Sequence, residues 1–591
     1  MNVSPLLVVA ATTLLMLVAA AAVPRFRRPG SLARATPVGI AAGIAASVAL
    51  DALDIWTAAA YVAVVTFVAA GVAVLRVGEG RAAVRRARTR LLFGVPWGTL
   101  LAAGGVVAFY LFVQFGAQNP RSPLVVPFVS WSYFYPFGTV TAAFAHASLG
   151  HVTGNVIATL ALAPLAEYAF SHFPTERGAS AFSSWRTNPY VRAFVLFPLG
   201  VLVVGLLTAV FSWGATIGFS GVVFAFAGFA LVRYPLATVL AVSAREVLSL
   251  LWTVIRDPIV FASASPSFSP PWWAGVAVQG HMFGFLVGAV LASVLVMRRD
   301  NRPSAARIWF GAVLLASSLS LWAVWWYGTV DDFVLYRAAG VLLVATLAII
   351  LTVVVRADDR TLVQDISTRK AAFAVLLVPV VTMSLVAVPV NVTTVADADL
   401  PGDPVEIRGY EVTYAEDVTN ERVAGVDFPY FAEATNVSAS GVIVANEDRQ
   451  IWTEQVSAGE LGFYGDRAVK VGGVGWTERV TVHRRGWVAS GGSAVYNVYV
   501  VPPDGDSRHV FASESSTADP RIGGRQVRVD AAGGGFGLEV LRNDSVVESV
   551  QIPGENETAT AGGLTFVRNE TRVYAEYGNT SVQVASEETY E

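Results

Sequence analysis

The sequence predicts an all-α membrane bundle of many helices, followed by an all-β domain outside the membrane. The chain has 591 residues, of which 54% are hydrophobic and 14% charged, with a mean hydropathy of +0.55. A soluble domain carries about 25% charged residues. Apolar stretches of about 20 residues, the length that crosses a bilayer, recur before residue 391 and then stop.

We expect about twelve membrane helices. Three of them, near 5–23, 37–54 and 56–75, form an N-terminal extension. No Lys or Arg precedes the first, which favours a retained helix over a cleaved signal peptide. The others are expected at 92–115, 149–170, 191–211, 218–234, 236–255, 278–297, 308–327, 333–355 and 371–390.

These stretches divide the chain into an N-terminal extension (1–91), a core of about six helices (92–300), three further helices (301–390) and the β domain (391–591). Residues 391–591 carry 15 Lys+Arg and 31 Asp+Glu of the chain's 41 and 44, which leaves 26 and 13 for the rest. The basic residues of the helical part concentrate in loops that all fall on one side of the predicted topology. By the positive-inside rule that side is cytoplasmic, so we expect a multi-pass protein of the cell membrane with both termini outside.

From Asn391 onward, short runs alternate apolar and polar residues between Gly and Pro breaks, which is typical of an all-β sandwich. Its acidity suits a high-salt exterior, and the near absence of Lys beside many Arg suggests a halophilic archaeal source. This extracytoplasmic domain also contains sequons that are acceptable for N-glycans, at Asn391, Asn436, Asn543, Asn556, Asn569 and Asn579.

Composition excludes several kinds of site. The chain has no Cys, so it has no disulfides, thiolate metal sites or cysteine nucleophiles. Its basic residues are scattered over short loops, which argues against a nucleic-acid surface. We expect no cofactor, and a nucleophile has to be Ser, Thr, Lys or a carboxylate.

One candidate nucleophile stands at the start of a predicted helix. Gly218-Phe-Ser220-Gly221 opens the helix at 218–234. Its small residues allow close backbone approach, and the unpaired N–H groups of the helix start point towards Ser220. Ser in a membrane helix is usually a packing residue, so this motif alone assigns no function.

A histidine stands at the start of another predicted helix, in Gly280-His281-Met-Phe-Gly284, with Gly288 one turn later. Histidine in a membrane span is costly and therefore functional by default, although a backbone carbonyl could also satisfy it. Gly284 and Gly288 form a small-xxx-small face that lets a neighbouring helix approach closely. We expect Ser220 and His281 at the same outer depth, where they can meet.

A third motif, His146-Ala-Ser-Leu-Gly-His151-Val-Thr-Gly-Asn155, enters the helix at 149–170. His151 and Asn155 are four residues apart on one helix face, and both can donate to an oxyanion. The alternative is a metal bound by His146 and His151. No third ligand lies at suitable spacing, so we expect no metal.

These motifs, His-x4-His-x3-Asn, Gly-x-Ser-Gly and Gly-His-x2-Gly-x3-Gly, each at the outer start of a helix, resemble those of the rhomboid intramembrane serine proteases over about 92–300. The resemblance implies Ser220 as the nucleophile and His281 as the general base and acid. It also implies an oxyanion site of His151, Asn155 and the backbone N–H of Ser220. Supporting positions carried over with it are His146, Glu167, Gly218, Gly221, Phe224, Gly284 and Gly288.

The chain departs from the family pattern in three places. Phe224 stands where some members have a Tyr under the base, and Gly280 stands where Ala is usual. The loop around Trp131 is aromatic but lacks the family's Trp-Arg pair, so its seating in the membrane is expected to differ.

The implied activity is hydrolysis of peptide bonds in or near transmembrane segments of other membrane proteins, within the lipid bilayer. Two alternatives stay open. One is a catalytically inactive rhomboid-like protein that binds or escorts membrane clients, with the outer β domain as its working part. The other is a transporter, suggested by the helix count, but the sequence shows no internal repeat.

Overall fold

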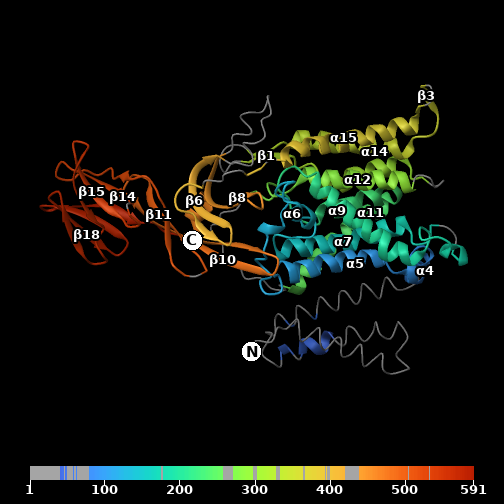
Figure 1. Cartoon of the computed structure of the whole chain (residues 1–591), viewed down its shortest axis with the longest axis horizontal. Coiled ribbons are helices and arrows are strands. Elements are labelled where there is room, and N and C mark those ends of the chain that lie inside the picture. The colour runs from blue at the N-terminus through green and yellow to red at the C-terminus, as the bar shows by residue number, and fades with distance from the viewer. Residues whose placement is uncertain are drawn as a thin grey trace.

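The computed structural model describes residues 79–174, 177–256, 271–296, 302–327, 333–363, 366–392, 394–395, 400–419, 438–503, 505–531 and 533–591, with short pieces between 40 and 62. Apart from those pieces, the three predicted N-terminal helices lie outside the described residues, as does the sequon at Asn436. The described chain forms a helical bundle with a β region at one of its ends (Figure 1).

The bundle helices fall where the apolar stretches predict them. In chain order they are α5 (Trp97–Ala108, extended by a π-helical turn to Val113), α7 (Leu149–Phe170), α9 (Phe197–Val210, continuing from Pro189), α10 (Ser220–Arg233), α11 (Pro235–Arg256), α12 (Val278–Val296), α13 (Ala305–Ser318), α14 (Arg337–Arg356) and α15 (Thr368–Asn391). Among the described residues, 5 helices are long and apolar enough to cross a membrane, and shorter apolar helices accompany them. This part therefore has the character of a multi-pass membrane bundle.

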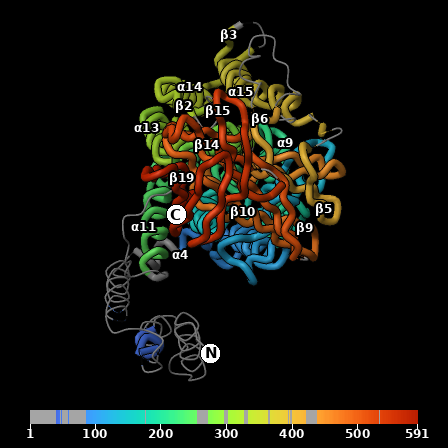
Figure 2. Tube along the Cα trace, turned by 90° about the vertical axis from the view of Figure 1, so that its left-hand side faces the viewer, coloured from blue at the N-terminus to red at the C-terminus, as the bar shows by residue number. Residues whose placement is uncertain are grey.

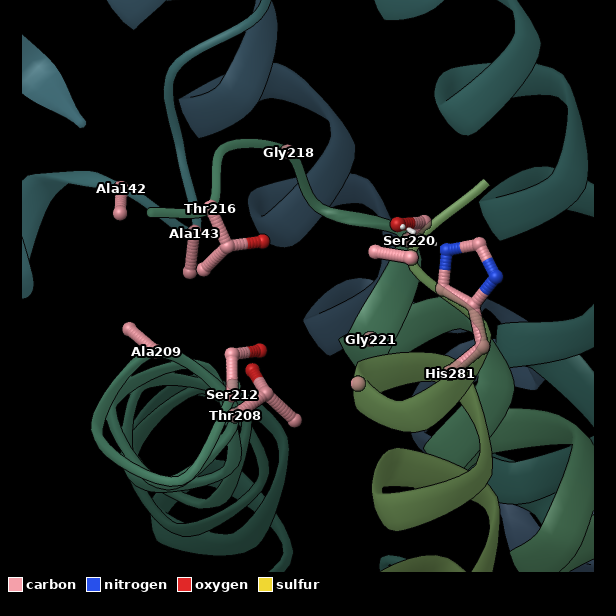
Figure 3. A pocket seen from close by; sticks show the side chains of 12 residues that line it. Ala142, Ala143, Thr208, Ala209, Ser212, Thr216, Gly218, Ser220, Gly221 and His281 are labelled. Atoms are coloured by element: carbon pink, nitrogen blue, oxygen red, sulfur yellow. Dashed lines mark hydrogen bonds between the residues drawn. The ribbon is translucent and has the colours of Figure 1, made fainter. Parts of the chain in front are cut away.

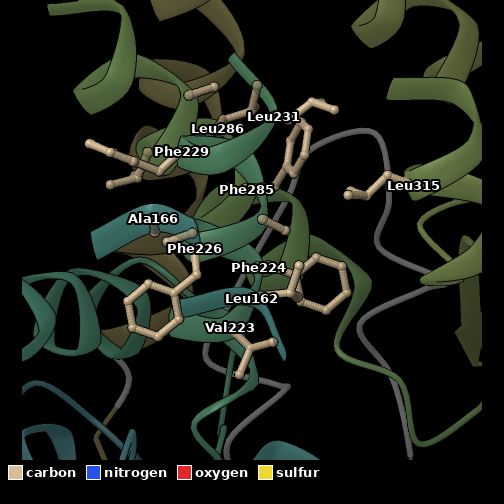
Figure 4. Close-up of a cluster of buried hydrophobic side chains, with 14 of the residues drawn as sticks. Leu162, Ala166, Val223, Phe224, Phe226, Phe229, Leu231, Phe285, Leu286 and Leu315 are labelled. Carbon is tan, nitrogen blue, oxygen red and sulfur yellow. The ribbon is translucent and has the colours of Figure 1, made fainter. Parts of the chain in front are cut away.

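Helix α10 is the centre of the bundle, since every residue from Gly221 to Val232 is buried. Around it lie side chains of α7 and α12, such as Leu162 and Leu286 (Figure 4). A Cβ atom at Gly284 would collide with the carbonyl oxygen of Gly221. The small-xxx-small face of α12 thus lies directly against the backbone of α10, the close contact that helices use in lipid.

Helix α13 is shorter than the stretch 308–327 from which it was predicted. It ends at Ser318, and Ser320 then adopts a left-handed φ of 58°. The aromatic residues that follow form a hairpin, in which β1 (Trp325–Tyr327) pairs with β2 (Phe333–Leu335). Aromatic and β-branched residues favour strands, so the end of the apolar run leaves the helix.

The basic segments lie at the end of the bundle away from the β region. The short helix α4 (Glu79–Arg90), rich in Arg, ends where the Arg90 carbonyl accepts the N–H of His172, just after α7. Arg302, just before α13, donates to the Ala357 carbonyl at 2.6 Å, just after α14. The β region starts at the opposite end, after α15 (Figure 1). These described basic residues lie at one end of the bundle, which is the distribution that the positive-inside rule expects of a cytoplasmic side.

The described β region has two large hydrophobic cores and a third, smaller cluster around Ile443 and Trp452, where the sequence suggested one sandwich. Its strands are β5 (Val405–Ile407), β6 (Tyr410–Thr419), β7 (Ser438–Asn446), β8 (Ile451–Ser457), β9 (Asp466–Gly473), β10 (Trp476–Ala489), β11 (Ala494–Val501), β12 (Arg508–Ala512), β13 (Ser516–Thr517), β14 (Gln526–Asp530), β15 (Gly537–Arg542), β16 (Ser545–Gln551), β17 (Thr558–Ala561), β18 (Leu564–Asn569), β19 (Arg572–Tyr577) and β20 (Thr580–Glu587). We call β5–β12 the proximal lobe and β13–β20 the distal lobe.

Strand β10 joins the two lobes. Its first part pairs with β9 and its last residues pair with β20, all antiparallel. Val480 and Val482 point into the proximal core with 0% exposure, whereas Trp487 belongs to the distal core. One long strand thus serves both cores, and the lobes follow one another away from the bundle (Figure 1). Viewed along this direction, the strands lie in front of the helices (Figure 2).

The proximal lobe shares its core with the segment between α5 and α6 (Pro136–Thr141), residues 114–135. Val126, Val129 and Trp131 of this segment are buried in the same cluster as the valines of the lobe. Lys470 of β9 also donates to the carbonyl of Ser122. The aromatic, uncharged loop noted in the sequence is therefore seated against protein.

The structure overturns one predicted glycan site. Asn391 is only 3% exposed, and its side-chain Nδ2 donates to the carbonyl of Ser212 at 2.7 Å. N-glycosylation attaches the sugar to this same nitrogen and needs a surface position, so the prediction for Asn391 is wrong. The sequon asparagines of the distal lobe are exposed and remain predictions, at Asn543, Asn556, Asn569 and Asn579.

Candidate active site

Ser220 and His281 meet at the end of the bundle that carries the β region. Ser220 is the first residue of α10, and His281 lies in the first turn of α12. The Nε2 atom of His281 is 2.8 Å from the Oγ atom of Ser220 (Figure 3). This is hydrogen-bonding distance between a hydroxyl and a ring nitrogen that could accept its proton.

Gly218 prepares the turn that presents Ser220. It has a φ of +118°, a conformation that residues with side chains rarely adopt. A Cβ atom at this position would lie 2.7 Å from the Nε2 atom of His151. Its own N–H donates to the carbonyl of Ala142 at 2.8 Å, which ties the turn to the segment before α7. Both the backbone angle and the contact with His151 therefore require glycine.

The ring of Phe224 lies flat against the imidazole of His281. The ring centroids are 4.3 Å apart with an angle of 13° between the planes. The other ring nitrogen of His281, Nδ1, is buried and has no hydrogen-bond partner among the described residues. Within the described chain, the pair is therefore oriented by an aromatic face, where many serine hydrolases use a carboxylate.

His151 and Asn155 of α7 lie on the other side of Gly218. Ser148 caps α7 by accepting the N–H of His151 at 3.1 Å. The Nδ1 atom of His151 accepts the N–H of Ala147 at 3.4 Å, which assigns the ring proton to Nε2, beside Gly218. The Nδ2 atom of Asn155 is buried without a partner among the described residues, 3.8 Å from the Cβ position of Gly218. The Nε2 atom of His151 and the Nδ2 atom of Asn155 are thus two hydrogen-bond donors beside the turn that leads to Ser220.

His146 contacts this turn through a hydrogen bond to Phe219 and is itself held by Gln114. Its Nε2 atom accepts the N–H of Phe219 at 3.5 Å, and its ring meets that of His151 edge to face at 4.9 Å. Gln114 bonds both the carbonyl and the N–H of His146, at 3.0 and 2.8 Å. Sequence reasoning missed Gln114, although a buried polar residue at the end of an apolar helix is a usable signal.

Glu167 lies far from this site, at the other end of α7, about 24 Å along the helix from His151. Its carboxylate is fully buried and accepts the backbone N–H groups of Gly98 and Thr99 at 2.8 Å, so it caps the start of α5. The ring of His172 lies 2.7 Å from the same carboxylate. Glu167 thus makes structural contacts, and sequence reasoning missed His172.

A small cavity opens beside Ser220, between α9, α10 and the segment before α7 (Figure 3). Its walls are mostly Ala and Gly, and besides Ser220 they carry three hydroxyl side chains that sequence reasoning did not single out. The lining residues are Ala142, Ala143, Thr208, Ala209, Ser212, Thr216, Gly218, Ser220, Gly221, Ala277, Gly280 and His281.

Comparison with known proteins identifies the domain that carries this site. Residues 134–298 match the family model described as Rhomboid domain. Comparison with curated proteins and with solved structures found no match. The matched segment contains all three sequence motifs, from His146 to Gly288, and excludes α13–α15 and the β region. The chain therefore contains a rhomboid domain, which spans residues 134–298.

Proposed function

We propose that the chain is a serine endopeptidase that hydrolyses peptide bonds in or near transmembrane segments of other membrane proteins. The observation that carries this proposal is the 2.8 Å contact between Ser220 Oγ and His281 Nε2 at the start of two closely packed helices. The match of residues 134–298 to the Rhomboid domain supports the same chemistry.

In the proposed reaction, the Ser220 oxygen attacks the carbonyl carbon of the substrate peptide and its proton passes to Nε2 of His281. This requires the resting ring to carry its proton on Nδ1. The imidazolium that forms lies over the face of Phe224, an arrangement that stabilises a cation by about 0.5–1 kcal/mol or more when water is absent. His281 then returns the proton to the leaving amine, which gives an acyl-enzyme, and water repeats the sequence to release the acid.

The negative oxygen of the tetrahedral intermediate needs donors that are already in place. The proposal assigns this role to the Nε2–H of His151, the Nδ2 of Asn155 and the backbone N–H of Ser220, which has no acceptor within its own helix. Loss of one such donor costs about 10²–10³-fold in rate. With no carboxylate beside His281 in the described chain, we expect slow turnover.

The proposal places the chain in the cell membrane with the β region outside the cell. The segregation of basic segments to the far end of the bundle supports this orientation. The alternative, an inactive family member that escorts clients, does not need a Ser and His in contact or a buried, unpaired amide at Asn155. An unpaired buried amide costs about 1–3 kcal/mol, which favours a role in binding charge.

The test is cleavage of a membrane reporter by purified chain in liposomes. Ser220→Ala and His281→Ala should each abolish cleavage, and Asn155→Ala should lower it by about 10²–10³-fold, because other donors remain. Labelling of Ser220 by a fluorophosphonate separates the two candidate functions, since an escort protein need not react. Cleavage that survives in Ser220→Ala would remove this residue from the mechanism.

A further inference from the structure

Residues 210–213, the last residue of α9 and the first three of its connection to α10, lead from the cavity wall towards Ser220; we call them the 210–213 loop. Ser212 of this loop lines the cavity, and its Oγ atom would lie 2.7 Å from a Cβ atom at Gly280, next to His281. The backbone of the loop is held from two sides by hydrogen bonds. These bonds come from two amide side chains that the reaction itself does not use.

On one side, Gln279 ties the loop to α12. Its Nε2 atom donates to the carbonyl of Phe211 at 2.9 Å, and its Oε1 atom accepts the N–H of Trp213 at 3.0 Å. Gln279 stands two residues before His281 on the same helix. A shift of the loop along α12 would therefore break both bonds, so the amide fixes the loop relative to the histidine.

On the other side, Asn391 ties the loop to the last turn of α15. Its Nδ2 atom donates to the carbonyls of Ser212 at 2.7 Å and Val210 at 3.3 Å. The carbonyl of Asn391 in turn accepts the N–H of Tyr133 at 2.8 Å, and the hydroxyl of Tyr133 donates to Val210 at 2.6 Å. Three separate segments of the chain therefore meet at this loop.

Asn391 also stands at the junction with the β region. Trp131, two residues before Tyr133, is buried in the core of the proximal lobe. Val395, four residues after Asn391, donates its N–H to Gln450 of the lobe at 2.8 Å. The proximal lobe therefore holds both chain segments that contact the 210–213 loop from this side.

We propose that Gln279 and Asn391 are positioning residues that clamp the 210–213 loop between α12 and the proximal lobe. The clamp sets the position of Ser220 relative to His281 and the width of the cavity. In this role the proximal lobe supports the active site directly, in addition to any contact with substrates. The proposal rests on the proposed function for its effect on rate, whereas its effect on loop position can be measured without any reaction.

The loop position can be measured by a disulfide, because the natural chain has no Cys. The Cβ atom of Ser212 lies 3.9 Å from the Cβ position of Gly280, within the range of about 3.5–4.5 Å that a disulfide needs. The full-length double variant Ser212→Cys/Gly280→Cys should therefore oxidise rapidly in detergent. Adding Asn391→Asp or Gln279→Glu, which keep the size but remove the donor, should slow this oxidation several-fold.

Matched controls are the same exchanges at exposed positions of the β region, Asn579→Asp and Gln455→Glu. These should leave the oxidation rate unchanged. Equal oxidation rates in the clamp variants and the controls would overturn the inference, whether or not the chain is active.

The second measurement is the rate of fluorophosphonate labelling at Ser220 in the single variants, normalised to the folded fraction from a thermal melt. We expect Asn391→Asp and Gln279→Glu to react about 10–100-fold more slowly, since small misplacements of reacting groups have effects of this size. A purely structural role would lower the melting temperature without changing the normalised rate, and this result would contradict positioning. If the wild type is neither labelled nor active while the disulfide assay responds, the proposed function fails and the clamp stands.

Discussion

The contact between α10 and α12 and the core of the distal lobe achieve close packing by opposite means. At the helix pair, Gly284 and Gly288 bring one backbone against the carbonyl oxygens of the other, with no side chain between them. In the distal lobe, Phe566 and neighbouring apolar side chains fill the core with 0% exposure. The helix contact depends on the absence of side-chain atoms at two glycines, whereas the core of the distal lobe depends on large side chains that fill it.

The difference follows from the solvent of each region. A helix in lipid gains little by exchanging lipid contacts for apolar protein contacts, so close backbone approach and hydrogen bonds have to hold the pair. A β lobe in water gains about 25 cal/mol for each Å² of apolar surface that it buries. The candidate active site is therefore built where added volume is destabilising, and the β region is built where removed volume is destabilising.

The largest effect on stability is expected for Phe566→Ala in the distal lobe. Removing a fully buried Phe side chain costs about 3–5 kcal/mol, because apolar burial is lost and a cavity remains. The measurement is thermal unfolding of the purified chain, followed by the β signal in circular dichroism. At temperatures where the lobe is still folded, labelling of Ser220 should be unchanged, because β18 contributes nothing to the cavity lining. A labelling rate that falls before the lobe unfolds would break the comparison.

Gly284→Ala is expected to destabilise the chain less than Phe566→Ala does, but to reduce labelling of Ser220 more. Alanine is the better helix former by about 1 kcal/mol, yet its methyl group would meet the carbonyl oxygen of Gly221. Overpacking of this kind costs about 1–3 kcal/mol and would move His281 away from Ser220. Fluorophosphonate labelling should fall strongly while the chain remains folded.

The matched control for this exchange is Gly200→Ala in α9, where a Cβ atom meets nothing within 4 Å. This variant should keep full labelling and melt no earlier than the wild type. Equal behaviour of Gly200→Ala and Gly284→Ala would show that the α10 and α12 backbones are not in the predicted close contact.

The sequence predicted the elements of the bundle well because local signals mark them. α7 begins and ends where the apolar stretch 149–170 does, since Ser148 is a strong N-cap and directly precedes it. The three motifs placed Ser220, His281 and His151 at helix starts, and the structure brings these residues together at one end of the bundle. Short-range patterns were sufficient for these features.

The sequence could not predict contacts that join distant segments. Asn391 matched a glycosylation sequon, which is a local pattern. Its side chain is instead buried, with hydrogen bonds to the carbonyls of Val210 and Ser212, far earlier in the chain. The burial of Val129 and Trp131 in the proximal lobe is equally non-local. This uncharged loop packs against a protein core that the sequence of the loop alone does not reveal.

The smallest effect is expected for Asp466→Asn on the surface of the proximal lobe. Burial alone would raise the pKa of Asp466, but hydrogen bonds from His483 at 2.6 Å and Arg485 at 2.9 Å outweigh it and lower the pKa. A carboxyl group with a lowered pKa stabilises the folded chain above its ordinary pKa of 3.8, and this contribution is lost as the pH falls through the folded-state value. Since the carboxylate is half exposed, solvent screens it, and we expect at most about 1 kcal/mol at pH 7.

The pH dependence of thermal unfolding checks this prediction. Asp466→Asn should melt slightly below the wild type at pH 7, and the difference should shrink as the pH falls below 3.8 and through the lower folded-state pKa. At pH 7, the variant should label at Ser220 as fast as the wild type, because these side chains belong to neither the cavity lining nor the shared core. A large loss at pH 7 would mean that the proximal lobe is held by its surface charges. The contact between the lobe and residues 114–135 would then be electrostatic and sensitive to salt. The structure instead shows an apolar contact, formed by Val126, Val129 and Trp131.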